Sequence, residues 1–271
     1  MNMYSIYLAL FSTLGINAYG AAIGVDLGTA GAFAILAGST VTNTGSSLVK
    51  GNLGVWPGTS ITGFPPGIVT GTIHSADAVS LQAQTDLTTA YNAAAGQPCG
   101  LDLSGTDLGG LTLTSGVYCF ASSAQLTGTL TLNAQGNPNA AFIFQIGSTL
   151  TTASSSSVVF TNGGQGGGVF YQVVSSATLG TDTAFAGNIL ALQSITLNTR
   201  AKIDCGRALA RNGAVTMDTN LVSIDVPGGC LAGTGSGSSE VPEPSTGTLT
   251  LLIGLPALIW IRKIKSLSQI I

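Results

Sequence analysis

Short runs in which apolar and polar residues alternate cover most of the chain. The alternation is clear over residues 111–114 and 126–132, and again over residues 195–199. A period of two residues is typical of β-strands that bury one face. Glycines and short polar turns separate the runs, as they do between strands. The pattern therefore predicts a mainly β fold built from many short strands.

One four-residue phrase recurs along this pattern: threonine, a large apolar residue, a small or polar residue, threonine. Its copies begin at Thr149, Thr178, Thr196 and Thr216, and the steps from Thr178 to Thr196 and from Thr196 to Thr216 are 18 and 20 residues. Steps of that length are typical of single coils in a β-solenoid. Stacked copies would align their threonines on one flat surface.

An early segment, residues 25–44, resembles residues 189–199 and is expected to join the same solenoid. Its place in the order of coils stays open. Residues 50–71 contain many turn residues and are expected to form an ordered loop. The glycine stretch 162–168 lacks the lysine and the following helix of a phosphate-binding loop, so it is expected to be a turn between coils.

Residues 75–95 depart from the alternation and predict one long helix. Ser75 is expected to be its N-cap, Asp77 places a negative charge in the first turn, and Gly96 and Pro98 end it. Small and apolar residues at helical spacing form one stripe, namely Val79, Ala83, Leu87, Ala90 and Ala94. We expect the helix to lie along one face of the solenoid, which that helix makes unavailable for binding.

Composition excludes several functions. Only 7% of the 271 residues are charged and the formal net charge is −3, so a nucleic-acid partner is not expected. The chain has one histidine, His74, which leaves little for a zinc site or a histidine-based triad, and no cofactor or metal is expected. The protein is not expected to be an enzyme. Asp102 and Asp107 are the nearest candidates for the clustered carboxylates of a polysaccharide lyase.

The four cysteines allow three pairings. Cys99–Cys119 and Cys205–Cys230 are favoured, because the members of each pair are close in sequence and can join adjacent turns. Free buried thiols are the alternative, and they are less expected in an exported protein.

The two ends of the chain indicate export. Residues 1–20 are typical of a secretory signal peptide, with a retained membrane helix as the alternative. A main domain is expected over residues 21–230 and a Gly/Ser linker over residues 231–240. The apolar stretch 246–261 is followed by Arg262, Lys263 and Lys265, which predicts a short membrane helix with a cytoplasmic basic end. Residues 266–271 form a short tail.

The C-terminal segment, residues 241–265, resembles a PEP-CTERM sorting signal, because Val-Pro-Glu-Pro precedes the apolar stretch and the basic end. Such signals occur in Gram-negative bacteria that make extracellular polysaccharide. The resemblance implies that an exosortase-type enzyme recognises Pro242, Glu243 and Pro244. It also implies that the helix inserts in the membrane before the anchor is removed.

Residues 25–228 resemble the bacterial and microalgal ice-binding-protein family. The matching stretches are residues 27–37, 52–55, 61–67, 142–146 and 206–215. The resemblance implies a right-handed, discontinuous β-solenoid of triangular cross-section with one long α-helix packed alongside. It implies a non-catalytic protein whose partner is the surface of an ice crystal.

The candidate ice-binding residues are the threonines of the repeated phrase and their neighbours: Thr149, Thr151, Thr152, Thr178, Thr181, Thr183, Thr196, Asn198, Thr199, Thr216 and Thr219. Strands in a stacked sheet repeat about every 4.8 Å and alternate residues along a strand about every 6.7 Å, close to repeats of the ice lattice. Charged residues lie in or beside the phrase, namely Asp182, Arg200, Lys202 and Asp218. The sequence does not settle which of them point outward, because strand parity shifts at each corner.

The sequence thus predicts an ice-binding protein exported to the cell surface or extracellular matrix of a Gram-negative bacterium. The alternative is a non-catalytic structural or adhesive protein that contacts extracellular polysaccharide. Sugar sites are usually lined by exposed aromatic side chains, yet only 6% of this chain is aromatic.

Overall fold

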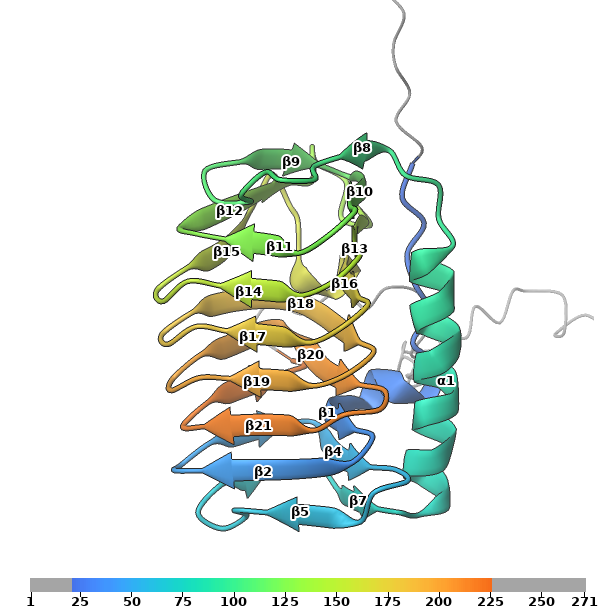
Figure 1. Cartoon of the computed structure of the whole chain (residues 1–271), viewed down its shortest axis with the longest axis vertical. Coiled ribbons are helices and arrows are strands. Elements are labelled where there is room, and N and C mark those ends of the chain that lie inside the picture. Colours follow the sequence, from blue (N-terminus) through green and yellow to red (C-terminus); the bar gives the residue numbers. More distant parts are fainter. Residues whose placement is uncertain (1–20, 226–271) are drawn as a thin grey trace, which may run out of the picture. The chain divides into compact units, whose positions relative to one another are not determined.

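The structure is a computed structural model that describes residues 21–225. The predicted signal peptide, linker, sorting signal and C-terminal helix lie outside these residues, so they stay predictions. Within residues 21–225, no helix has the length and hydropathy needed to span a bilayer. The described part is a stack of short strands that pair in parallel, with one α-helix alongside (Figure 1). The predicted mainly β solenoid with a flanking helix is confirmed.

The strands form three faces. The helix-side face contains β8 (Leu101–Asp102), β10 (Gly116–Phe120), β13 (Phe142–Ile146), β16 (Val169–Val173), the second halves of β18 (Ala184–Ala191) and β20 (Lys202–Ala210), β1 (Phe33–Ala37), β4 (Asn52–Val55) and β7 (Ile73–Ser75). The seven-stranded sheet contains, in spatial order, β11 (Ala124–Leu126), β14 (Leu150–Thr152), β17 (Ala177–Leu179), β19 (Ile195–Leu197), β21 (Val215–Asp218), β2 (Thr40–Thr44) and β5 (Ser60–Thr62). The third face contains β9 (Thr112–Thr114), β12 (Thr129–Asn133), β15 (Ser157–Thr161), the first halves of β18 and β20, β22 (Leu221–Ser223), β3 (Leu48–Lys50) and β6 (Ile68–Val69).

The first strands of the chain stack directly on the last ones. β1 pairs with β20, and β2 pairs with β21, while β4 and β5 continue the stack on the other side (Figure 1). The N-terminal coil therefore follows the C-terminal coil in space. This arrangement confirms the discontinuous solenoid. The expectation of an ordered loop over residues 50–71 was wrong, because β4, β5 and β6 lie in this segment and form the coil that stacks beyond the N-terminal one.

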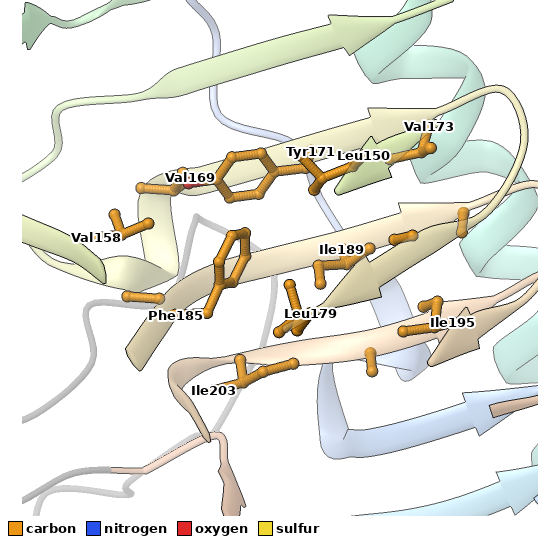
Figure 2. Close-up of a cluster of buried hydrophobic side chains, with 14 of the residues drawn as sticks. Leu150, Val158, Val169, Tyr171, Val173, Leu179, Phe185, Ile189, Ile195 and Ile203 are labelled. Carbon is orange, nitrogen blue, oxygen red and sulfur yellow. The ribbon is translucent and has the colours of Figure 1, made fainter. Parts of the chain in front are cut away.

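All three faces send side chains into one core. In Figure 2, Leu179 and Ile195 come from the seven-stranded sheet, Phe185 and Ile203 from the third face, and Tyr171 from the helix-side face. Stacked aromatic rings fill the centre. Phe144 lies 5.4 Å from Tyr118 and 4.7 Å from Tyr171, and Tyr171 lies 4.7 Å from Phe185, measured between ring centroids. Burial on this scale stabilises the solenoid, and close packing limits the movement of its strands.

Helix α1 (Ala78–Ala95) covers the helix-side face. Ala83, Leu87, Ala90 and Ala94 are buried against apolar residues of that face, as the stripe predicted. Val79, which was expected in the stripe, is 46% exposed, because Ser80 takes the buried position one turn before Ala83 and Gln84.

The helix starts later than predicted, and Ser75 is not its N-cap. Asp77 is the N-cap: its Oδ1 accepts a hydrogen bond from the Ser80 backbone N–H at 2.8 Å, and the Ser80 hydroxyl accepts one from the Asp77 N–H at 3.1 Å. Ser75 lies in β7 and donates its hydroxyl to the Thr59 carbonyl at 2.8 Å. Aspartate is favoured as the N-cap because its carboxylate accepts the hydrogen bond and also places a negative charge at the positive end of the helix dipole.

We predict that this cap makes the stability of the protein sensitive to acid. Hydrogen bonds from the Ser80 backbone and from His74 lower the pKa of Asp77 to about 2, from 3.8. Because the folded-state pKa is depressed, the stabilisation is present above about pH 4 and is lost as pH falls through 2. Asp77→Asn keeps a capping side chain without the charge. Between pH 4 and pH 2 its melting temperature should fall less steeply than that of the wild type, measured by circular dichroism. Parallel pH profiles would contradict the prediction.

A disulfide joins Cys99, just after the helix, to Cys119 in β10, with an S–S distance of 2.09 Å. This confirms the first predicted pairing. Cys230 lies outside the described residues, so the Cys205–Cys230 pairing stays a prediction.

A buried arginine holds the N-terminal segment to the C-terminal coil that contains β20 and β21. Arg207 in β20 donates from Nε and Nη2 to the Gly31 carbonyl at 2.9 and 2.6 Å, and from Nη1 to Asn188 Oδ1 at 2.8 Å. Gly31 belongs to a short 3₁₀ helix, Gly28–Ala32, that leads into β1. Burial lowers the pKa of the Arg207 guanidinium to about 10, so the group stays protonated at neutral pH.

Candidate functional site

A straight column of threonines runs along the outer surface of the seven-stranded sheet. We call it the threonine column, and its members are Thr151, Thr178, Thr196, Thr216, Thr42 and Thr62. Each is paired in register with the next, and Gln125 of β11 continues the column at one end. Most residues that flank these threonines are apolar and point inward, and Thr151 and Thr42 each also have a buried polar neighbour, Thr152 and Asn43. The β period therefore turns one threonine outward on each of six strands. None of the six hydroxyls is hydrogen-bonded to another described residue.

A second column lies two residues earlier along the chain, at the first residue of each strand or just before it. It contains Ser123, Thr149, Ser176, Ser194, Ala214, Thr40 and Ser60. Several of its hydroxyls are already used. Ser123 and Thr149 share a hydrogen bond of 2.8 Å, and Ser194 Oγ accepts from the Ala214 N–H at 3.2 Å. This column is therefore less free to bind outside water than the threonine column.

The structure divides the predicted site residues into three groups. Thr151, Thr178, Thr196 and Thr216 lie in the threonine column, with Thr149 and Asn198 on its two sides. Thr181, Thr199 and Thr219 lie beyond the ends of the strands, at the corner between the sheet and the third face. The alignment of the copy that begins at Thr149 with the copy that begins at Thr178 was wrong by two residues, because Thr151 is the residue that pairs with Thr178.

Two predicted residues do not belong to any outer surface. Thr152 is 3% exposed and Thr183 is fully buried, and their hydroxyls share a hydrogen bond of 2.8 Å inside the corner. The inclusion of Thr152 and Thr183 is therefore corrected. Thr152 directly follows the outward Thr151, so its side chain points the opposite way. Thr183 follows Thr181 across a turn, and the turn reverses the direction of its side chain.

Thr42 and Thr62 were missed. They precede the repeated phrase by more than 80 residues and do not share its form, so no phrase search finds them. They join the column only because β2 and β5 stack beneath β21. The available signal was the strict alternation of residues 40–44, in which threonines occupy every second position.

The charged residues lie at the edge of the sheet or beyond it. Asp182 and Arg200 occupy the corner, where both have positive φ, and form a bidentate ion pair with two N–O distances of 2.7 Å. The hydrogen bond to Arg200 lowers the pKa of Asp182. Lys202 belongs to the third face, while Asp218 ends β21 with its carboxylate accepting from the Thr199 hydroxyl at 2.5 Å. No charge interrupts the threonine column between Thr151 and Thr62.

The two aspartates considered for lyase chemistry serve local turns. Asp102 Oδ1 accepts from the Ser104 N–H at 2.8 Å, and Asp107 Oδ1 accepts from the N–H groups of Gly109 and Thr127 at 2.7 and 2.8 Å. Burial raises the pKa of Asp107, but these hydrogen bonds outweigh it and leave the pKa lowered. Both groups are therefore engaged as acceptors in their own turns.

Comparison with known proteins adds a second line of evidence. Residues 35–223 match the family model described as Ice-binding-like. The chain is 57% identical over 259 residues to an ice-binding protein of Nostoc sp. (strain HG1), covering 95% of this chain and 94% of the relative.

Solved structures agree. An ice-binding protein from an Antarctic biological consortium superposes with a TM-score of 0.73 at 48% identity, covering 75% of this chain and 92% of that one. An ice-binding protein from Antarctomyces psychrotrophicus gives a TM-score of 0.72 at 42% identity, covering 75% of this chain and all of the other. Together with the matched solenoid, the family model shows that this chain belongs to the Ice-binding-like family.

Proposed function

We propose that this protein binds ice through the seven-stranded sheet and that the threonine column is the centre of the binding surface. The observation that carries the proposal is the unbroken register of six outward threonines whose hydroxyls make no hydrogen bond within residues 21–225. The names of the relatives, which are ice-binding proteins from Nostoc and from two Antarctic sources, support the same proposal.

The geometry suits an ordered water layer. Threonines on adjacent strands repeat about every 4.8 Å, and the flanking column lies about 6.7 Å away along each strand. Each threonine offers a hydroxyl that joins a water network and a methyl that restricts the water beside it. The packed core beneath holds the array rigid, so little conformational entropy is lost when the crystal is bound. The bound waters bridge protein and ice as ordered interfacial water does elsewhere.

A tyrosine in the middle of the column tests the proposal. In Thr196→Tyr the ring projects from the sheet and holds a flat crystal away from the neighbouring threonines. We expect inhibition of ice recrystallisation to need at least about tenfold more protein, which corresponds to roughly 1.4 kcal/mol of lost binding. Ice shaping, observed by microscopy of single crystals, should be lost in parallel.

The matched control is Thr89→Tyr, which places the same ring on the exposed side of helix α1. It should leave activity unchanged. Full activity in Thr196→Tyr, or no activity in the wild type, would sink the proposal. The second result would favour a structural or adhesive role in an extracellular matrix.

We also propose that the protein is exported and held at the cell surface or in the surrounding matrix, where external ice forms. The support is the sequence of residues 1–20 and of the segment 241–265, with the apolar stretch 246–261 as a membrane anchor until an exosortase-type enzyme removes it. A mass spectrum of protein recovered from the medium tests this. A mature chain that ends near Ser245 is expected, whereas one that still contains Trp260 would contradict processing.

A further inference from the structure

The third face carries a second hydroxyl-rich array at the end of the solenoid formed by β9, β12 and β15. Its outward positions are Thr112 and Thr114 on β9, Thr129, Thr131 and Asn133 on β12, and Ser157, Val159 and Thr161 on β15. We call these residues the third-face array. Thr131 lies at its centre, paired with Thr112 on one side and Val159 on the other. The function proposed above does not use this surface.

The third-face array shares its regular strand pairing, its lack of charge and part of its hydroxyl availability with the threonine column. Within it, Thr129 and Ser157 share a hydrogen bond of 2.8 Å, and Asn133 Oδ1 accepts one from the Asn162 side-chain amide at 2.9 Å. β12 and β15 pair over five consecutive residues without a bulge, so the surface keeps a regular strand repeat. The hydroxyls of Thr112, Thr131 and Thr161 make no hydrogen bond with another described residue. None of its members is charged. The first charged residue along this face is Lys202, which is separated from Ser157 by Ala184.

The array is continuous with the seven-stranded sheet at this end of the stack. Only Thr127 and Gly128 separate β11 from β12, and only residues 153–156 separate β14 from β15. These two connections carry no charge. In the next coils the same corner holds the Asp182–Arg200 ion pair, whose strongly hydrated groups end the uncharged surface there. Asp107 lies near the edge, but its carboxylate is engaged by the Gly109 and Thr127 N–H groups.

We propose that the third-face array is a second ice-binding surface, which takes ordered water and ice as its ligand and adds to the binding by the threonine column. The proposal rests on the proposed function. Two faces that meet at a convex corner point in different directions, so one flat crystal plane contacts only one of them. The second surface therefore engages ice that grows past the first, and it holds the protein on a crystal that is enclosing it.

The test measures adsorption of the fluorescently labelled full chain to a single-crystal ice hemisphere. Five proteins are compared: wild type, Thr131→Tyr, Thr196→Tyr, the double variant, and Thr89→Tyr as the control. Thr131→Tyr should lower the bound amount, Thr196→Tyr should lower it by about tenfold yet leave residual binding, and the double variant should bind no more than background. Thr161→Tyr on β15 should repeat the effect of Thr131→Tyr, and it replaces that variant if Thr131→Tyr melts earlier than wild type.

The outcomes separate the two claims. Wild-type adsorption that neither Thr131→Tyr nor Thr161→Tyr changes would overturn the second surface alone. So would a Thr196→Tyr variant that binds no more than the double variant. If Thr131→Tyr loses binding and Thr196→Tyr binds as much as the wild type, the second surface is supported and the threonine column is overturned. A wild type that does not adsorb would overturn both.

Discussion

Phe144→Ala is expected to lower the free energy of unfolding by about 3–5 kcal/mol, because it opens a cavity in the middle of a buried aromatic stack. Phe144 is fully buried, with Tyr118 and Tyr171 stacked on its two sides. Both neighbours lose a ring contact of the kind that contributes about 0.5–1.5 kcal/mol beyond area burial. Chemical denaturation followed by circular dichroism measures the change. A loss below about 1 kcal/mol would show that the stack closes around the gap.

Tyr171→Phe is the matched control, because it keeps the ring and removes only the hydroxyl. Tyr171 is fully buried, and its hydroxyl has no hydrogen-bond partner in the described part of the chain. Burial raises the pKa of this group, so it stays neutral. Removal of an unpaired buried hydroxyl relieves its desolvation cost, and we expect stability to be unchanged or higher by about 1 kcal/mol. A clear loss would point to a bound water beside the hydroxyl.

Arg207→Met is expected to cost about 2–4 kcal/mol, because the Gly31 carbonyl and the Asn188 amide each lose a buried donor worth about 1–3 kcal/mol. Methionine keeps most of the apolar stem, so the variant isolates the guanidinium. The Gly31 segment precedes β1, and the loss should therefore loosen the contact between the N-terminal coil and the C-terminal coil, where β1 pairs with β20. Hydrogen exchange should speed up first in residues 28–37 and in their partners on β20.

Arg211→Met provides the comparison for this variant. Arg211 lies over the Tyr91 ring at 4.8 Å and donates to the Thr88 hydroxyl at 3.3 Å, at the edge of the helix. Its replacement should cost about 1 kcal/mol or less. Equal costs for the two substitutions would contradict a special role for Arg207, as would unchanged exchange in residues 28–37.

Much of the fold could be predicted from the sequence because its strands repeat one simple period. The alternation in residues 126–132 and 195–199 identifies strands that face both core and solvent. The flanking helix is visible through Ala83, Leu87, Ala90 and Ala94. The order of the coils did not follow from local pattern, because the pairing of β2 with β21 joins residues more than 170 positions apart. Nothing in either strand alone specifies that partner.

The candidate site was harder to predict than the fold. The direction of a threonine depends on strand parity, and each corner of the solenoid shifts that parity by its own length. Thr151 and Thr152 are adjacent, yet one is exposed and the other shares a buried hydrogen bond with Thr183. The charges raised the same difficulty: Arg200 is close to Thr199 in sequence, but its left-handed backbone turns it along the corner toward Asp182.

The discontinuous stack has a consequence for the order in which the molecule is made. A ribosome synthesises β1 and β2 first, but their partners β20 and β21 are among the last strands of the domain to be made. Until then, β1 and β2 can pair only on one edge, with β4 and β5, and their other edges stay unpaired. Pairing across such long separations is slow, because loop-closure entropy must be overcome before contacts form. The nascent chain thus remains incompletely folded until nearly the whole domain exists, the state in which a polypeptide can pass through a narrow translocation pore.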